Sequence, residues 1–321
     1  MSDVFRHRPA NVFAGGGLDR AGLLRKDADW VARQLADAGS VVILTWRDKH
    51  FVAPGPEAAP AFMATAEALA LAHPEAPPTL LAIHGEKAVF SADISHLDDP
   101  ATHPALAGRG EFMDVRDIAA TMSNAHAQML AHSRALAYWH RRHRFCGNCG
   151  APTVAQEAGH VRVCTNADCG LHHFPRTDPA VIMLVVDGDR CLLGRRPGRD
   201  NRMYSTLAGF VEPGESLEEA VAREVMEETG IAISAAHYAH SQPWPFPANL
   251  MLGFYAEAAT TEVRINEEEL ADARWFTRDE VRALMAARDR AEAEAAGLTA
   301  HLPRPISIAR RLIGEWMNGL A

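Results

Sequence analysis

The stretch from Gly209 to Ile231 constrains this chain more than any other. Its sequence, GFVEPGESLEEAVAREVMEETGI, is a glycine turn followed by a short segment with helical character. Ser216 is a preferred N-cap residue, and Glu219 three residues later completes a capping box. Gly230 is placed to end the helix, as glycine often does just beyond the last turn. We therefore expect a loop, a short helix and a second turn here.

Three glutamates of this helix create an electrostatic problem. Glu224, Glu227 and Glu228 are spaced i, i+3 and i+4, so they share one helix face and repel one another. Arg223 is an i+4 neighbour of Glu227, but it does not balance three carboxylates alone. One interpretation is a solvated acidic face, as in most glutamate-rich helices. The other is a carboxylate cluster that holds Mg²⁺ or Mn²⁺ and bridges it to substrate phosphates.

The spacing of the fixed positions favours the second interpretation. Written as Gx5Ex7REVxEExGI, residues 209–231 match the Nudix box at every fixed position. The chain thus resembles the Nudix hydrolases. This resemblance implies a Nudix α/β/α sandwich, with a mixed sheet between helices and the box as loop, helix and loop. It also implies that the three glutamates are catalytic.

Length and composition limit the number of domains and the class of protein. A chain of 321 residues with 48% hydrophobic and 23% charged residues is long enough for about two globular domains. We find neither an apolar run of about 18 residues nor a signal-peptide pattern, so we expect a cytoplasmic protein with no membrane partner. The net charge of −9 argues against broad, nonspecific binding to nucleic acid.

Four of the five cysteines are clustered upstream of the box. Cys146 and Cys149 are separated by two residues, and Cys164 and Cys169 by four. Each pair lies beside glycine, which allows the tight turns that direct two thiolates toward one ion. Four thiolates form a closed tetrahedral shell for Zn²⁺, which makes the expected site structural rather than catalytic. We therefore expect a zinc ribbon over residues 141–177.

A proline-rich segment follows the box. Residues 241–249 read SQPWPFPAN, and three alternating prolines exclude a helix or a central strand. We expect a stiff extended loop that presents Trp244 and Phe246, although a polyproline ligand for a partner protein is an alternative. The segment closely resembles the SQPWPFPxS motif of the NADH pyrophosphatase branch of the Nudix hydrolases. Asn249 stands where that motif has serine, and both residues can donate a hydrogen bond.

The first 140 residues carry no catalytic motif. We expect a buried strand over residues 40–46, a hairpin over 79–94 and one or two amphipathic helices over 116–140. This segment is similar in its position to the divergent N-terminal domain that precedes the zinc module in NADH pyrophosphatases. The expected organisation is an N-terminal α+β domain at 1–140, the ribbon at 141–177 and the Nudix domain at 178–321. Two strands flanking Asp187-Gly188 should open the Nudix domain.

The resemblance assigns roles to individual residues. Cation ligands would be the carboxylates of the three box glutamates, the backbone oxygen of Ala208 and Glu269, although Glu267 and Glu268 allow a shift of one residue. The general base would be either Glu227 or Glu228. Arg195 and Arg196 are either solvated charges or phosphate contacts, and the sequence favours neither. The expected substrate-binding residues are Phe174, Phe210, Gln242, Pro243, Trp244, Pro245, Phe246, Pro247, Ala248, Asn249 and Ala309.

The implied reaction is hydrolysis of the pyrophosphate of NADH or NAD⁺ to AMP and nicotinamide mononucleotide, with removal of NAD caps from RNA 5′ ends. A catalytic Mg²⁺ or Mn²⁺, a structural Zn²⁺ and a homodimer belong to the same expectation. One rival is a Nudix hydrolase for other nucleoside diphosphate derivatives such as ADP-ribose, against which the Trp244 and Phe246 segment argues. The other is a zinc-ribbon nucleic-acid-binding protein with a non-catalytic Nudix platform, which the intact glutamates disfavour.

Overall fold

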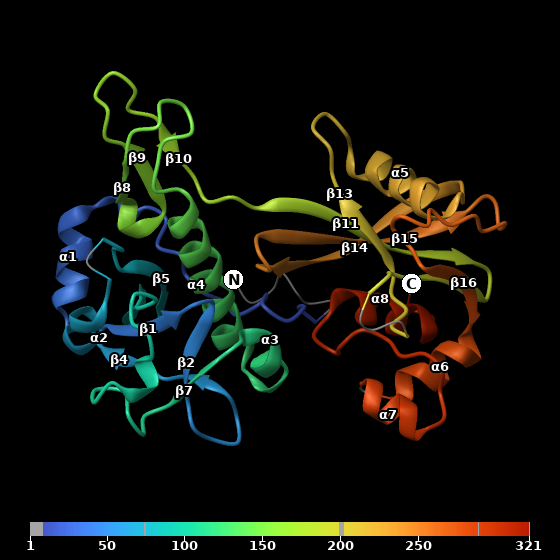
Figure 1. Cartoon of the computed structure of the whole chain (residues 1–321), viewed down its shortest axis with the longest axis horizontal. Helices are drawn as coiled ribbons and strands as arrows, with labels where there is room; N and C mark the ends of the chain where they lie inside the picture. Colours follow the sequence, from blue (N-terminus) through green and yellow to red (C-terminus); the bar gives the residue numbers. More distant parts are fainter. Residues whose placement is uncertain (1–8, 74, 199–201, 288, 321) are drawn as a thin grey trace. The chain divides into compact units, whose positions relative to one another are not determined.

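The structure is a computed structural model that describes residues 9–73, 75–198, 202–287 and 289–320. The chain forms two compact units (Figure 1). The first unit comprises the described residues up to Thr177 together with Trp244–Ala248. The second comprises Asp178–Pro243 and Asn249 onward. No helix within the described residues is long and apolar enough to cross a membrane.

The first unit is built on a mixed sheet in the order β3-β2-β1-β6-β5, with β4 paired to β1 and β7 to β2. The central pair β1 and β6 is parallel, whereas β1 and β2 form an antiparallel hairpin. The strands are β1 (Val41–Trp46), β2 (Lys49–Ala53), β3 (Ala59–Pro60), β4 (Met63–Ala64), β5 (Thr79–His84), β6 (Lys87–Asp93) and β7 (Glu111–Met113). The expected strand near residues 40–46 and the hairpin over 79–94 are confirmed.

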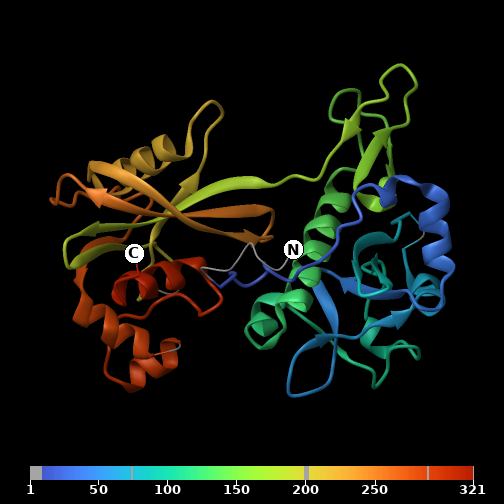
Figure 2. The same ribbon diagram turned by 180° about the vertical axis from the view of Figure 1, so that it is seen from behind.

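Helices cover both faces of this sheet. The helices α1 and α2 share a hydrophobic core with Val42, Leu44 and Phe90. The long helix α4 packs along β5 and β1 (Figure 2). The helical segments of this unit are η1 (Leu24–Lys26), α1 (Ala28–Ala36), α2 (Thr65–Leu71), η2 (Pro100–Thr102), α3 (Val115–Ile118), η3 (Ala119–Thr121) and α4 (Asn124–Arg142). The expected helices over 116–140 are therefore confirmed as α3 and α4.

The cysteine-rich segment forms a small antiparallel sheet in the order β10-β9-β8. Its elements are β8 (Thr153–Gln156), η4 (Glu157–Gly159), β9 (Val161–Cys164) and β10 (His172–His173). It packs within the first unit through His160, whose Nε2–H donates to the carbonyl of Leu80 at 2.7 Å while Nδ1 accepts from Arg25 at 3.0 Å. A carbonyl can only accept, so this histidine is the neutral Nε2–H tautomer.

A second histidine repeats this arrangement. The Nε2–H of His140 donates to the carbonyl of Gly159 at 2.8 Å, and Nδ1 accepts from Arg162 at 3.0 Å. Burial, with a contribution from the neighbouring arginines, lowers the pKa of both His140 and His160 to about 4. The junction between the ribbon and the rest of the first unit therefore depends on two neutral imidazoles.

The second unit holds a mixed sheet in the order β14-β15-β11-β12-β16, with β13 paired to β11. The pair β11 and β15 is parallel, and β12 is antiparallel to both β11 and β16. The elements are β11 (Asp178–Asp187), β12 (Arg190–Arg195), β13 (Leu207–Phe210), α5 (Leu217–Thr229), β14 (Ile233–Trp244), β15 (Asn249–Ala258), β16 (Asp272–Thr277), α6 (Arg278–Ala286), α7 (Arg290–Ala295) and α8 (Ile308–Met317). The expected hairpin at Asp187-Gly188 is confirmed.

Alternating residues of β11 separate two cores. Val181 and Met183 pack with α5 on one face of the sheet, and Ile182 and Leu184 pack with α6 and α8 on the other. The sheet is thus a middle layer between helices (Figure 1), and the predicted Nudix α/β/α sandwich is confirmed.

The structure differs from the sequence analysis at the proline-rich segment. We expected an extended loop over residues 241–249, but Ser241 to Trp244 form the end of β14. This strand lies at the edge of the sheet. Pro243 is tolerated there because one side of an edge strand has no neighbouring strand. The absence of an N–H on that side therefore costs no hydrogen bond between strands. The remaining residues to Ala248 form the turn into β15.

Candidate active site

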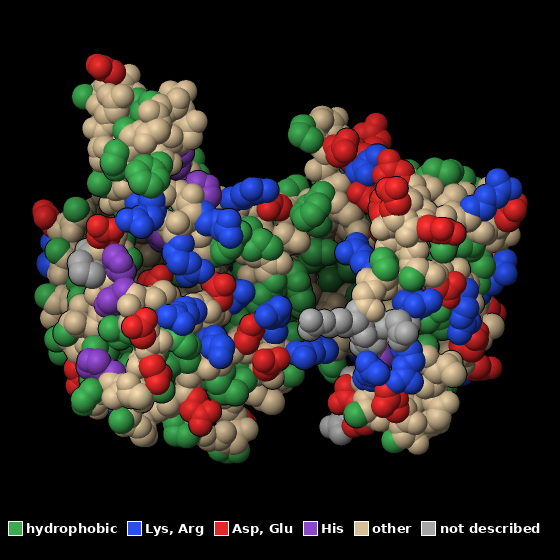
Figure 3. Space-filling model, viewed as in Figure 1, with side chains coloured by type: hydrophobic (Ala, Val, Ile, Leu, Met, Phe, Trp, Pro, Cys, Tyr) green, Lys and Arg blue, Asp and Glu red, His purple; other side chains and the backbone are tan. Residues whose placement is uncertain are grey.

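The Nudix box folds as its sequence predicts. The hydroxyl of Ser216 accepts from the backbone N–H of Glu219, whose carboxylate accepts in return from the N–H of Ser216 at 2.8 Å. The helix α5 ends at Thr229, and Gly230 adopts the left-handed conformation with φ of 69°. Acidic side chains gather over α5 in Figure 3.

Three carboxylates converge at this helix, and they differ from the expected set. Glu224 and Glu228 of α5 meet Glu269 from the loop before β16, with one oxygen of each lying within 4.8 Å of the others. Glu269, rather than Glu267 or Glu268, is the residue of its run that joins this group among the described residues. Glu227 instead points to Arg223, which donates to it at 3.0 Å. We call Glu224, Glu228 and Glu269 the carboxylate cluster.

Gly209 makes room for this cluster. A Cβ atom at this position would lie 1.8 Å from Cδ of Glu224, which is far closer than two non-bonded atoms can approach. The carboxylate therefore lies directly against the backbone of β13, which only glycine permits. The first glycine of the box is needed for close approach, not for an unusual backbone angle.

Arg223 connects the loop to the helix. Its guanidinium forms a bidentate pair with Glu215 at 2.7 and 2.9 Å and donates to the carbonyl of Phe210 at 2.9 Å. It also donates to Glu224 at 2.8 Å. The carboxylate of Glu215 has its pKa lowered to about 2, mainly by this arginine. The fixed spacing of Glu215 and Arg223 was visible in the sequence, but their role as a brace for the loop was not.

Glu228 provides the test of whether a cation fits. The residue is 1% exposed, and its Oε2 atom has no hydrogen-bond partner among the described residues. Burial raises the pKa of Glu228 to about 7, and burial also raises the pKa of Glu224. Buried carboxylates with an unsatisfied oxygen are stabilised by a bound cation. An all-oxygen donor set suits Mg²⁺ or Mn²⁺, so the residues fit the expected ion.

Arg196 lies beside the same oxygens. Its Nη2 donates to the carbonyl oxygen of Ala208 at 3.0 Å and lies 3.9 Å from Oε1 of Glu228. The sequence left open whether Arg195 or Arg196 is a solvated charge. Arg195, by contrast, lies near the ring of Tyr204, 5.9 Å from its centroid.

The four clustered cysteines have the geometry of a zinc site. Their Sγ atoms lie within 4.8 Å of one another, with 3.8 Å between Cys146 and Cys169 and 3.4 Å between Cys149 and Cys164. A tetrahedral site with Zn–S bonds of about 2.3 Å places its sulfurs about 3.8 Å apart. The longer spacing of the second pair is accommodated by a turn that ends at Gly170, with φ of 55°.

Comparisons with known proteins cover most of the chain. Residues 176–301 match the NUDIX domain, 141–174 the NADH pyrophosphatase zinc ribbon domain and 39–139 the NADH pyrophosphatase-like rudimentary NUDIX domain. The NAD-capped RNA hydrolase NudC of Mycobacterium bovis is 39% identical over 316 residues, 97% of this chain and 96% of that protein. The chain belongs to the NADH pyrophosphatase family of Nudix hydrolases. It is therefore a hydrolase that requires a divalent cation, with a structural zinc ribbon.

Two further relatives of this Nudix family are similar to the chain over different lengths. The NAD-capped RNA hydrolase NudC of Mycobacterium tuberculosis is also 39% identical, over the same 97% of this chain and 96% of its own. The human NAD-capped RNA hydrolase NUDT12 is 45% identical over 163 residues, which are 48% of this chain and 35% of that protein. The first similarity extends beyond the catalytic domain, and the second covers about half of the chain.

The candidate aromatic residues of this Nudix hydrolase fall into two groups. Phe174 is 66% exposed and Phe210 is 57% exposed, so both rings are available to a ligand. Trp244 and Phe246 instead pack together at 5.1 Å, and each contacts the fully buried Phe13 of the first unit. We call Phe13, Trp244 and Phe246 the aromatic cluster.

Two arginines cover the ring of Phe246. The guanidinium of Arg116 lies 5.1 Å from its centroid and that of Arg134 lies 4.8 Å away. Arg134 also donates to the carbonyl of Pro245 at 3.0 Å, and Pro245 is buried. The sequence could not reveal these contacts, because the partners lie more than 100 positions upstream.

The other expected substrate residues also differ in accessibility. The side chain of Gln242 is buried, donates to the carbonyl of Ile306 at 2.8 Å and accepts from the N–H of Ile308 at 2.8 Å. It therefore fixes the start of α8. Ala309 is 2% exposed within the core, so its methyl group faces protein. Asn249 has a buried Oδ1 with no partner among the described residues. Pro243 and Ala248 are half-buried, and Pro247 is exposed.

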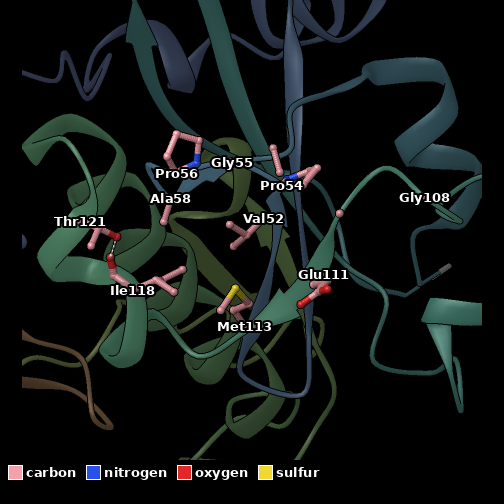
Figure 4. A pocket seen from close by; sticks show the side chains of 12 residues that line it. Val52, Pro54, Gly55, Pro56, Ala58, Gly108, Glu111, Met113, Ile118 and Thr121 are labelled. Carbon is pink, nitrogen blue, oxygen red and sulfur yellow. Dashed lines mark hydrogen bonds between the residues drawn. The ribbon is translucent and has the colours of Figure 1, made fainter.

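A separate cavity lies wholly within the first unit. It measures about 430 Å³ and is lined by residues of β2, β7 and the α3 region, including Val52, Met113 and Ile118 (Figure 4). Its lining is largely apolar, and Glu111 is the carboxylate at its wall. None of the expected site residues contributes to it.

Proposed function

We propose that this protein hydrolyses the pyrophosphate of NADH and NAD⁺ to AMP and nicotinamide mononucleotide and removes NAD caps from RNA 5′ ends. The observation that carries the chemistry is the carboxylate cluster with its buried, unpartnered Glu228 oxygen. The likeness to NAD-capped RNA hydrolases over nearly the whole chain supports the substrate. Water adds across the P–O–P anhydride, so one phosphate gains its oxygen and the other leaves with the bridging oxygen.

The proposed cation ligands are Glu224, Glu228, Glu269 and the carbonyl oxygen of Ala208. A divalent cation bound there supplies charge neutralisation for the pyrophosphate and a more acidic water. Glu227 lies outside the carboxylate cluster and is half exposed, so it is our candidate for the base that takes the proton from water. On this assignment Glu227→Gln lowers turnover and leaves Mn²⁺ affinity unchanged, whereas Glu228→Gln weakens Mn²⁺ binding. Equal effects of both changes on Mn²⁺ affinity would contradict it.

We propose that Phe210 stacks on a base of the substrate, and Phe174 is a separate candidate for such stacking. Their exposure supports this role better than the packing of Trp244 and Phe246 does. Stacking of a base on an aromatic ring contributes roughly 1–3 kcal/mol. Phe210→Ala should therefore reduce kcat/KM for NADH about five- to 150-fold and affect a small pyrophosphate substrate without a second base much less. An equal loss for both substrates would show that the ring acts on the fold instead.

The decisive test is a product assay. NADH, NAD⁺, NAD-capped RNA and ADP-ribose are incubated side by side with the enzyme and Mg²⁺ or Mn²⁺, and the products are separated by chromatography. AMP and reduced nicotinamide mononucleotide from NADH, with conversion of NAD-capped RNA to 5′-monophosphate RNA, would support the proposal. Preferential cleavage of ADP-ribose would favour the rival hydrolase.

The remaining partners and the location are also proposals. A homodimer follows from the family resemblance, and light scattering on the eluting protein would test it. The proposed compartment is the cytoplasm, because all five cysteines are free thiols and four of them suit zinc.

A further inference from the structure

Arg196 and the divalent cation require the same oxygen atoms. The guanidinium donates to Ala208 O at 3.0 Å and lies 3.9 Å from Glu228. Those two groups are also proposed cation ligands. Mg²⁺ binds its oxygen ligands at about 2.0–2.1 Å in a demanding octahedral arrangement. A carbonyl oxygen that coordinates the ion so closely cannot also hold a guanidinium in the same direction, and the two positive charges repel.

The surroundings of Arg196 allow its side chain a second conformation. Its side chain is 70% exposed, whereas that of Glu228 is 2% exposed, so the arginine reaches inward from solvent to a buried acid. It follows directly after the last residue of β12, Arg195. A guanidinium that leaves Ala208 can turn outward without breaking a core contact. Guanidinium groups bind phosphate oxygens through paired donors, and the substrate of a Nudix hydrolase carries a pyrophosphate at this point.

Arg223 does not share this behaviour. Its guanidinium is fixed by Glu215 and the carbonyl of Phe210 in addition to Glu224. Its hydrogen bonds within the described residues go to groups other than Ala208 and Glu228, and its side chain is 24% exposed. The two arginines therefore differ: Arg223 braces the loop, and Arg196 contacts Ala208 O and Glu228.

We propose that Arg196 competes with the catalytic cation for Ala208 O and Glu228, and that the displaced side chain then binds the pyrophosphate of the substrate. The contact with the pyrophosphate rests on the proposed function, whereas the competition concerns cation binding alone. The proposal adds to the site a positively charged residue that the box motif does not include.

The test measures Mn²⁺ affinity and turnover separately in the full chain. Arg196→Gln removes the charge and leaves a shorter, polar side chain, and Arg196→Lys keeps the charge but loses the paired donors. Arg282→Gln, which removes an exposed arginine paired with Asp279 on α6, is the matched control. Free Mn²⁺ is followed by electron paramagnetic resonance at low ionic strength, and NADH cleavage is measured at saturating Mn²⁺.

Arg196→Gln should bind Mn²⁺ roughly three- to tenfold more tightly, because a competing positive charge is gone. Its kcat for NADH should fall at least about tenfold, because a phosphate contact is lost. Arg196→Lys should keep Mn²⁺ affinity near that of the wild type and lose turnover. The control should change neither quantity.

Unchanged or weaker Mn²⁺ binding by Arg196→Gln would overturn the competition. Unchanged turnover at saturating Mn²⁺ would overturn the phosphate contact. If the wild-type enzyme does not cleave NADH, the proposed function fails while the Mn²⁺ measurement still decides the competition. Melting temperatures of the variants equal to that of the wild type would exclude a folding defect as the cause.

Discussion

The sheets of the two units have the same strand connections, yet within the described residues only the second sheet supports a carboxylate cluster. The order β5-β6-β1-β2-β7 in the first unit corresponds to β14-β15-β11-β12-β16 in the second. The central pair is parallel in both, and a short strand, β4 or β13, pairs antiparallel to the central strand and leads to a helix. The match of residues 39–139 to a rudimentary NUDIX domain agrees with this correspondence.

The difference lies where the short strand meets the helix. Counted from the turn of each hairpin, Ala64 of β4 corresponds to Ala208 of β13. In the first unit Ala64 is already the N-cap of α2, a helix of 7 residues with Glu67 as its acidic residue. In the second unit a loop from Val211 to Ser216 intervenes, and α5 has 13 residues. The fold therefore forms without the loop and the glutamates, which supply chemistry rather than architecture.

The units also differ in how they are stabilised. The catalytic sheet is enclosed by two hydrophobic cores. The first unit adds a ribbon whose own sheet is too small to bury a core, and it holds this ribbon through cysteines and the neutral histidines His140 and His160. We therefore expect metal loss and acid to act on the first unit before the second.

The largest effect is expected from a matched pair of substitutions in the corresponding helices. Glu228→Gln removes a buried carboxylate of the carboxylate cluster and should reduce kcat about 10²- to 10³-fold. Glu67→Gln in α2 removes an exposed acid paired with Arg109 and should leave kcat unchanged. Steady-state NADH hydrolysis measures both. A comparable loss in the two variants would break the distinction between the helices.

A second substitution tests the close approach at the strand. Gly209→Ala places a methyl group on Glu224, so the carboxylate must move, and a shift of about 1 Å can reduce turnover up to about 10²-fold. Gly22→Ala has open space around its Cβ and a backbone angle that alanine accepts, so it is the control. Turnover and Mn²⁺ affinity are measured together. Full activity of Gly209→Ala would show that the carboxylate does not need this contact.

Removing a zinc ligand should affect stability before chemistry. Cys146→Ser should lose the one zinc ion per chain and lower the unfolding temperature of the first unit, because the metal takes the place of a core in the ribbon. Cys191→Ala changes a buried cysteine of β12 and should retain the zinc. Elemental analysis and calorimetry provide the readouts. Zinc content that does not change in Cys146→Ser would contradict the ribbon assignment.

The smallest expected effect is a loss of folding stability at acid pH. The pKa of His160 is about 4 in the folded chain and near 6.5 when unfolded, so the unfolded chain binds protons first as pH falls. The stability it contributes is complete above about pH 6.5 and is lost as pH falls toward 4. We expect a loss of roughly 1–3 kcal/mol per histidine.

His160→Gln can form the same two hydrogen bonds without binding a proton, so it should flatten the dependence of stability on pH. The exposed His237→Gln should not. The free energy of unfolding is measured with denaturant between pH 7.5 and 4.5. Identical slopes for wild type and His160→Gln would refute the role of the neutral imidazole.

Much of the site could be predicted from sequence because its signals are local. The capping residues Ser216 and Glu219, the ending glycine Gly230 and the spacing of the cysteines each depend on neighbours a few positions away. The two apolar runs that flank Asp187-Gly188 likewise predicted the hairpin that β11 and β12 form. Such patterns are fixed by backbone geometry, which repeats every 2 or about 3.6 residues.

Only the tertiary structure decided which side chains meet. Glu269 joins Glu224 across 45 positions, whereas Glu227 turns to Arg223 although its spacing matches. The aromatic cluster and the burial of Gln242 likewise depend on partners far away in the chain. Side-chain direction and long-range packing are set by the whole fold. The sequence by itself determined the type of chemistry and its helix, and the fold decided the ligands, the braces and the rings that stay free.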